Sequence, residues 1–245
     1  KISSSAATAA GIDWERRNRL TIFRAVYNLQ SRNFIEASKL LQESISTFQT
    51  PELFGEEKLV LYTVCTSLIA IDSRSELNNK CVRQPDVISS INQTPHLHDL
   101  LHSFYKGEYS AFILHLGLIT EEVLQQDKIL GQHATYFCKE MRAKAYNQYI
   151  TPYRSVGFSQ MAREFGVSLE FLEIDLERFI TAGKVHARID KVTKRNIIGN
   201  EGESLGGVVE TRRVETKGVK LDAVLTGADK LISKMQKIVG SVIHL

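Results

Sequence analysis

The sequence of 245 residues has few of the residues that break or cross-link a chain, with only 4 prolines, 15 glycines and 3 cysteines. So little proline and glycine excludes a collagen-like, mucin-like or largely disordered chain and favours an ordered protein. No apolar run approaches the ~20 residues of a membrane-spanning helix, so we expect no membrane partner. The cysteines are odd in number and widely spaced. They predict neither a disulfide framework nor a zinc knuckle, and they fit a reducing compartment.

An excess of charge of one sign is also lacking. Lys and Arg total 31 against 28 Asp and Glu, which leaves a net charge of +3. This balance does not indicate a dedicated nucleic-acid binder.

Catalytic motifs are absent as well. The glycine-rich stretch 199–207 is not followed by Lys-Ser/Thr, so it is no phosphate-binding P-loop, and its spacing is not a dinucleotide fingerprint. His98 and His102 lie four residues apart, but the Glu of zinc proteases and a third ligand are missing, so we predict two histidines without a metal. There is no Gly-x-Ser-x-Gly elbow, and the cysteines show no local protease signature. We therefore predict no enzyme, and no catalytic, cofactor-binding or metal-binding residues.

Helical periodicity dominates the sequence up to residue 150. We interpret residues 1–10 as a linker or disordered segment and residues 11–150 as paired amphipathic helices of a tetratricopeptide-like (TPR-like) solenoid. The first pair spans 13–48, and Leu20, Phe23 and Tyr27 are expected to form the apolar stripe of its first helix. Further helices are predicted at 57–71, 97–105, 109–124 and 132–149. The polar stretch 72–95 is expected to be a long connection with one short helix near 87–91.

The pattern changes after residue 150. A short helix at 159–165 ends at Gly166, and Ser168 can cap a second helix that stops at Gly183. Alternating apolar and polar residues then predict strands at 185–190 and 208–214, joined by the glycine-rich stretch. Two helices followed by two strands are typical of a winged helix, which we place at 151–216.

The second of these helices, which would read DNA in a winged-helix nucleic-acid binder, has the wrong charge for that role. It carries four carboxylates against Arg178 alone, although the two strands and their connection have a net charge of +3. Since phosphate neutralisation dominates nucleic-acid affinity, such binding is the weaker alternative.

Residues 217–245 are predicted to form one long helix with two adjoining apolar stripes. A helix that packs against one partner helix in a coiled coil needs only one apolar stripe. Two adjoining stripes therefore give a face wide enough for several partner helices. Docking on its own chain is the alternative, but we favour contacts with other subunits. The predicted contact residues in this segment are Leu221, Leu225, Leu231, Ile232, Met235, Ile238, Val239 and Val242. A second interface is predicted on the strands, at Val185, Ile189 and Val209.

Several segments together resemble one known family. Residues 13–20, 32–41, 139–146, 161–167 and 178–183, with Val209-Glu-Thr-Arg212, resemble the PCI-domain lid subunits of the 26S proteasome regulatory particle, the non-ATPase regulatory subunit 6 family. Two stretches depart from the family pattern: 193–207 looks like an insertion between the two strands, and 72–95 matches poorly.

The resemblance implies a mainly α fold: a right-handed TPR-like solenoid, a winged-helix PCI domain with a small antiparallel sheet, and a C-terminal assembly helix. It also implies a non-catalytic scaffold in a hetero-oligomer with other lid PCI subunits and neighbouring regulatory-particle subunits, in the cytoplasm and nucleus. The PCI subunits of the COP9 signalosome or of a translation-initiation complex are the nearest alternatives.

Overall fold

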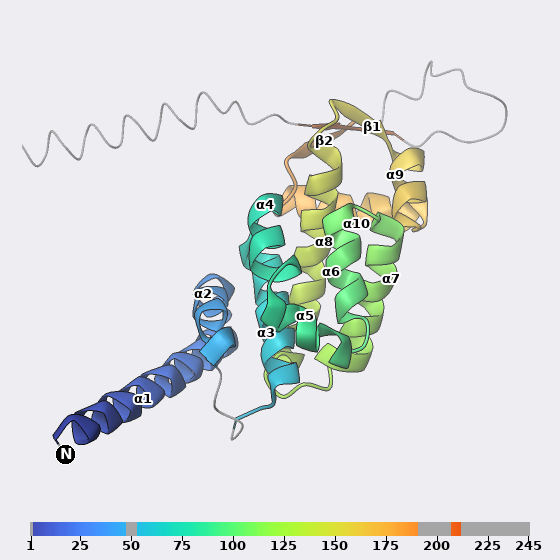
Figure 1. Ribbon diagram of the computed structural model, residues 1–245. Helices are drawn as coiled ribbons and strands as arrows, with labels where there is room; N and C mark the ends of the chain where they lie inside the picture. Colours follow the sequence, from blue (N-terminus) through green and yellow to red (C-terminus); the bar gives the residue numbers. More distant parts are fainter. Residues whose placement is uncertain (1, 48–52, 191–206, 212–245) are drawn as a thin grey trace, which may run out of the picture.

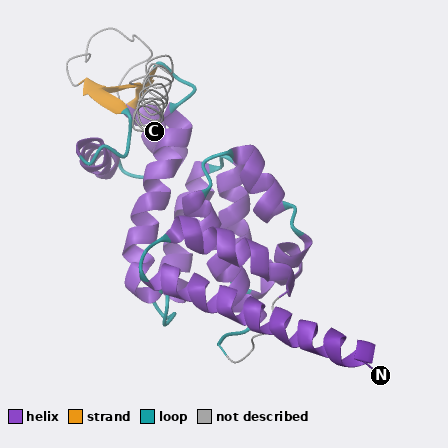
Figure 2. Cartoon of the chain, turned by 90° about the vertical axis from the view of Figure 1, so that its left-hand side faces the viewer, coloured by secondary structure: helices purple, strands orange, loops and turns teal. Residues whose placement is uncertain are grey.

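The structure, a computed structural model, describes residues 2–47, 53–190 and 207–211. This part of the chain is mainly helical and contains a three-stranded antiparallel sheet. The α1–α2 pair lies at one end of the molecule and the sheet at the other, with the remaining helices between them (Figures 1 and 2). The predicted mainly α fold with a small sheet is therefore confirmed for the described residues.

The helical part contains eight α-helices among the described residues, and α1, α3 and α8 are the longest of them. Its α-helices are α1 (Ile2–Gln30), α2 (Phe34–Ser44), α3 (Glu56–Ala70), α4 (Arg74–Leu77), α5 (Pro85–Ser90), α6 (Leu97–Lys106), α7 (Tyr109–Ile119) and α8 (Ala134–Ile150). Short 3₁₀ turns are Ile45–Thr47, Ile91–Gln93 and Gly131–His133, and single π turns are Asn78–Val82 and Thr120–Leu124. The stretch 72–95, expected as one long connection with a single short helix, thus contains α4, a π turn, α5 and a 3₁₀ turn.

The first helix differs from its prediction in two ways. Residues 2–10, expected as a linker, belong to α1, in keeping with the high helix propensity of their four alanines. Moreover, the stripe of Leu20, Phe23 and Tyr27 is not buried, since these side chains are 56, 52 and 70% exposed. The face that packs on α2 is instead the smaller-residue stripe Ile22, Ala25 and Leu29, with 0% exposure. Both stripes have helical spacing, so periodicity alone could not choose between them.

The third helix lies at the centre of the helical part, as its apolar sequence predicted. Every residue from Leu59 to Leu68 is buried, including the hydroxyl side chains of Tyr62, Thr63, Thr66 and Ser67. Thr63 and Thr66 satisfy their hydroxyls by donating to the backbone carbonyls of Leu59 and Tyr62, at 2.7 Å each. Such local hydrogen bonds make burial of a polar side chain tolerable.

A buried carboxylate ties α3 to the loop before α8. Asp127 accepts hydrogen bonds from the hydroxyl of Tyr62, at 2.9 Å, and from the backbone N–H groups of Ile129 and Leu130, at 3.0 Å each. Lys58 Nζ lies 3.1 Å from the same carboxylate. Burial alone would raise the pKa of Asp127, but these hydrogen bonds outweigh burial and hold the pKa below its usual 3.8.

The C-terminal part has the predicted order of two helices followed by two strands, preceded by a strand that the sequence did not reveal. Its elements are β1 (Ser155–Gly157), α9 (Phe158–Phe165), α10 (Leu169–Thr181), β2 (Ala187–Asp190) and β3 (Val208–Thr211). The cap signals were read correctly: Gly166 has a left-handed φ of 64° after α9, and Ser168 Oγ accepts from Phe171 N at the start of α10.

Candidate protein-interaction surface

The small sheet presents β2 at an edge. The strand order is β1-β3-β2, and β3 pairs with both neighbours through Val209, which lies opposite Val156 on one side and Ile189 on the other. Within the described part of the chain, the outer edge of β2 has no strand beside it. The backbone groups on such an edge can pair with a strand of another chain.

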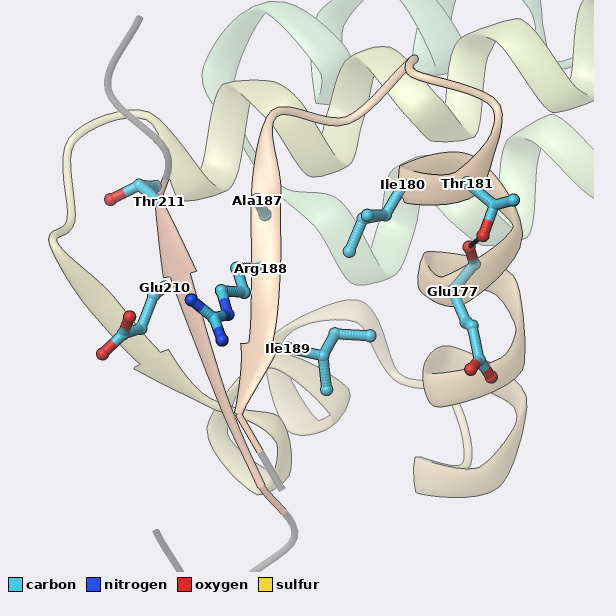
Figure 3. Close-up of a pocket in the computed structure, with 8 residues that line it drawn as sticks. All are labelled: Glu177, Ile180, Thr181, Ala187, Arg188, Ile189, Glu210 and Thr211. Atoms are coloured by element: carbon cyan, nitrogen blue, oxygen red, sulfur yellow. Dashed lines mark hydrogen bonds between the residues drawn. The ribbon is translucent and has the colours of Figure 1, made fainter. Parts of the chain in front are cut away.

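A hollow of about 650 Å³ lies beside this edge, between α10 and the sheet. In Figure 3, Ile180 of α10 and Ile189 of β2 point towards the space between their elements. Arg188 and Glu210 are directly opposite each other across β2 and β3 and therefore share the other face of the sheet. The hollow combines an apolar wall with a strand edge, and the whole lining is Glu177, Ile180, Thr181, Ala187, Arg188, Ile189, Glu210 and Thr211.

Of the three strand residues predicted as contacts, one lines this hollow and two do not. Ile189 is half-buried and faces it. Val185 and Val209 are 3% and 0% exposed, so their side chains belong to the core of this chain. Val209 also lies on the central strand β3, which pairs with β1 and β2, and Val185 precedes β2, so neither residue lies on the free strand edge.

A polar cluster on α8 sets the position of this surface relative to the helical part. Arg142 Nη1 lies 3.1 Å from Asp175 Oδ2 of α10, and the Tyr146 hydroxyl donates to the same oxygen at 3.1 Å. The Asp175 and Arg142 side chains are only 7% and 17% exposed. Burial, and then the charge of Asp175, raise the pKa of Tyr146, so its hydroxyl stays a hydrogen-bond donor.

Further contacts from α8 hold the connection between α10 and β2. Asn147 donates to the carbonyl of Lys184 at 2.7 Å and accepts from His186 N at 3.4 Å. The Lys184 ammonium pairs with Glu140. Elsewhere on α8, Lys144 donates to the carbonyls of Leu68 and Ile71, at 3.1 and 3.0 Å, at the end of α3. One helix thus makes polar contacts with both α3 and the α10–β2 region.

A larger hollow, of about 1060 Å³, lies between α4, α6 and α8. Lys144 and Asn147 line it, but both are used in the contacts just described. Arg74 donates to the carbonyl of Tyr105 and lies 5.0 Å from the centre of its ring. These side chains hold the fold together, and they do not form a nucleophile with a base.

The two histidines singled out in the sequence are neighbours on α6. The ring centres of His98 and His102 are 4.3 Å apart, and His98 Nδ1 lies 3.1 Å from Asp99 Oδ1. Partial burial, with the charges of His98 and Lys106, lowers the pKa of His102. Among the described residues, no three His, Cys, Asp or Glu side chains form a group that could hold a metal ion.

The predicted contacts of the C-terminal segment lie outside the described residues. They are Leu221, Leu225, Leu231, Ile232, Met235, Ile238, Val239 and Val242. Conversely, sequence reasoning missed Arg142, Tyr146 and Asp175 as a cluster. Arg142 and Tyr146 are four residues apart, a spacing that could have predicted that they share one face of α8. Their common partner Asp175, however, is 29 residues beyond Tyr146. In the helices that the structure describes, no segment is long and apolar enough to cross a membrane.

Comparison with known proteins gives two family matches. The family described as "26S proteasome subunit RPN7" matches residues 3–80, and "PCI domain" matches residues 92–198. Residues 81–91, between the two matches, lie within the stretch 72–95 that was expected to match the family poorly, whereas 72–80 and 92–95 belong to the matches.

Individual relatives align with nearly the whole chain. It is 38% identical over 228 residues to "26S proteasome non-ATPase regulatory subunit 6" of Dictyostelium discoideum, covering 93% of this chain and 56% of the relative. It is 34% identical over 238 residues to "26S proteasome regulatory subunit RPN7" of Saccharomyces cerevisiae, covering 96% of this chain and 52% of the relative. The chain therefore spans about half the length of these relatives. "COP9 signalosome complex subunit 1" of Arabidopsis thaliana is 29% identical over 168 residues, 69% of this chain and 36% of that protein.

Proposed function

Since the chain belongs to the RPN7 family of 26S proteasome subunits, we propose that it is a non-catalytic scaffold subunit of the lid of the proteasome regulatory particle. Its role is to position other subunits for the degradation of ubiquitinated proteins. The observation that carries the proposal is the alignment of 93–96% of the chain with proteasome subunits of distant organisms.

The described surface supports a role in assembly. The β2 edge and the hollow beside it can take a strand or an apolar side chain from a neighbouring subunit. The α8 contacts hold this surface at a defined angle to α3, which a scaffold needs. The partners are other lid PCI subunits and adjacent regulatory-particle subunits, met in the cytoplasm and nucleus.

We further propose how the domains and their roles are arranged along the chain. Residues 11–150 form a right-handed TPR-like solenoid, 151–216 a winged-helix unit that pairs with neighbouring PCI domains, and 217–245 a helix that joins a bundle with partner helices. The two apolar stripes of 220–243 support the last step, because each buried Leu or Ile gains roughly 1.5–3 kcal/mol over its exposed form.

The test is incorporation into the lid. In cells or in a reconstituted lid, the Leu225→Asp/Ile232→Asp variant should fail to co-migrate with the lid on a native gel, while its circular dichroism stays that of the wild type. A matched control, Lys230→Asp/Lys237→Asp, places the same new side chains at polar positions of the segment and should incorporate. Normal incorporation of the apolar-site variant would contradict the proposed bundle.

The COP9 signalosome is the second candidate, because one of its subunits also aligns with the chain. Its lower identity and coverage make it the weaker one. Mass spectrometry of the proteins co-purified with the tagged chain separates the two, and recovery of signalosome subunits without lid subunits would overturn the proteasome assignment. A translation-initiation complex would be recognised in the same experiment by its own co-purifying subunits.

A salt-dependent gel shift with duplex DNA or RNA would instead favour a nucleic-acid binder.

A further inference from the structure

The outward side of α10 carries an apolar pair. Phe171 and Ile174 are three residues apart, hence neighbours on the helix surface, and they are 43% and 52% exposed. Isolated exposed apolar residues are ordinary on protein surfaces. An adjacent aromatic and β-branched pair beside a hollow is more typical of an interface.

The aromatic ring of this pair is held in place before any partner arrives. The Arg142 guanidinium lies 5.5 Å from the centre of the Phe171 ring, and Arg142 is itself fixed by Asp175 at 3.1 Å. A side chain already ordered in the free protein loses less conformational entropy on binding. Phe171 therefore has the properties of a preorganised interface anchor.

The charge beside the pair selects the chemistry of a partner. Glu170 and Glu177 are exposed on α10, whereas Asp175 is buried against Arg142. Arg178 is the one cation of the helix. Carboxylates on this face repel nucleic-acid phosphates and favour a partner that brings Lys or Arg.

This face continues into the hollow beside β2, because Glu177, Ile180 and Thr181 of α10 line that hollow (Figure 3). We propose that α10 is a docking helix for a helix of another lid subunit. The partner helix covers Phe171 and Ile174 with an apolar stripe and places Lys or Arg side chains opposite Glu170 and Glu177. The proposal rests on the proposed lid function and names the chemistry of one interface within it.

Truncation of the pair tests the apolar part. Phe171→Ala and Ile174→Asp should each lower incorporation into a reconstituted lid, with a loss of affinity of about tenfold for the removal of a central anchor. Leu114→Asp is the matched control, because Leu114 is 61% exposed on α7 and should tolerate the change. Unfolding curves of the free variants show whether each one folds. Folded variants that incorporate like the wild type would overturn the proposal.

Charge reversal tests the electrostatic part. Glu170→Lys/Glu177→Lys should weaken incorporation, and the loss should shrink as salt concentration rises. Glu121→Lys, at another exposed acidic position, is the control. Equal incorporation of the double variant and this control would exclude the proposed basic partner.

Site-specific crosslinking identifies what covers the helix. A photo-crosslinking phenylalanine derivative is placed at position 174, or at 114 as control, in the assembled lid, and the linked peptide is sequenced. We expect a helical segment of another subunit with an apolar residue and a Lys or Arg within one turn. A link to an acidic segment, to a second copy of this chain, or to none contradicts the inference. If the wild-type chain itself does not enter the lid, the proposed function fails instead.

Discussion

The carboxylate of Asp175 should contribute strongly to the stability of the described fold. It accepts from Tyr146 and pairs with Arg142, and both partners come from α8, whereas Asp175 belongs to α10. Replacing Asp175 with Ala leaves a largely buried guanidinium and a buried phenol without their common partner. The change therefore removes the polar bridge between α8 and α10.

The magnitude follows from burial. The two charged side chains are only 7% and 17% exposed, so solvent screens the pair little. Removing one partner of such a buried pair costs about 3–5 kcal/mol, mostly because the other charge stays buried and unpaired. Tyr146→Phe keeps the ring and removes one hydrogen bond to a charged group, which is about 1.5–3 kcal/mol.

Urea unfolding, followed by far-ultraviolet circular dichroism and by fluorescence, measures both effects. The surface variant Glu36→Ala is the control, because its pair with Lys39 is about half exposed and should change stability by less than about 1 kcal/mol. A double-mutant cycle of Tyr146→Phe with Asp175→Asn should give a coupling of about 1 kcal/mol or more. If Asp175→Ala costs no more than Glu36→Ala, the bridge does not stabilise the fold and the reasoning is wrong.

Three further predictions concern the loop before α8, the turn after α9 and a glycine of α7. Because the pKa of Asp127 is held below 3.8, its contribution to stability should be complete above about pH 5 and lost as the pH falls through the lowered folded-state pKa. In urea unfolding measured from about pH 5 to 3, Asp127→Asn should therefore reduce the dependence of the midpoint on pH. An unchanged pH dependence would contradict this prediction. Gly166→Ala should destabilise by more than Gly183→Ala, because both have left-handed φ values, of 64° and 70°, but only at Gly166 would the new Cβ meet an atom, Ser110 Oγ, at 2.7 Å. Equal destabilisation by Gly166→Ala and Gly183→Ala in thermal unfolding would refute the steric contribution. Gly117 lies on the exposed side of α7, so Gly117→Ala should instead stabilise the protein by about 0.5–1 kcal/mol.

Local signals predicted most of the helices and one complete turn. The Gly166–Ser168 stretch marks both a helix end and the next helix start, because a left-handed residue and a capping hydroxyl act within a few residues. The apolar run in α3 likewise predicted a more buried helix, and residues 59–68 are buried. β1 was missed because it is only three residues long, and pairing with β3, more than 50 residues later, defines it.

The candidate surface was only partly predictable. Strand alternation located Ile189, but it could not show that Val209, at the centre of the sheet, is covered on its own chain. Exposure of Phe171 and Ile174 also depends on which side of α10 packs against α9 and β2, and α10 has apolar residues on more than one side.

The sequence by itself determined the fold class, the absence of recognisable catalytic motifs and the family resemblance, because helix periodicity, capping residues and motif spacing are local properties of the chain. Tertiary structure decided which of two apolar stripes of α1 is buried, which strand lies at the sheet edge, and that Arg142 and Tyr146 converge on Asp175. These outcomes depend on contacts between segments far apart in the chain, and such contacts are fixed by packing and burial across the whole fold.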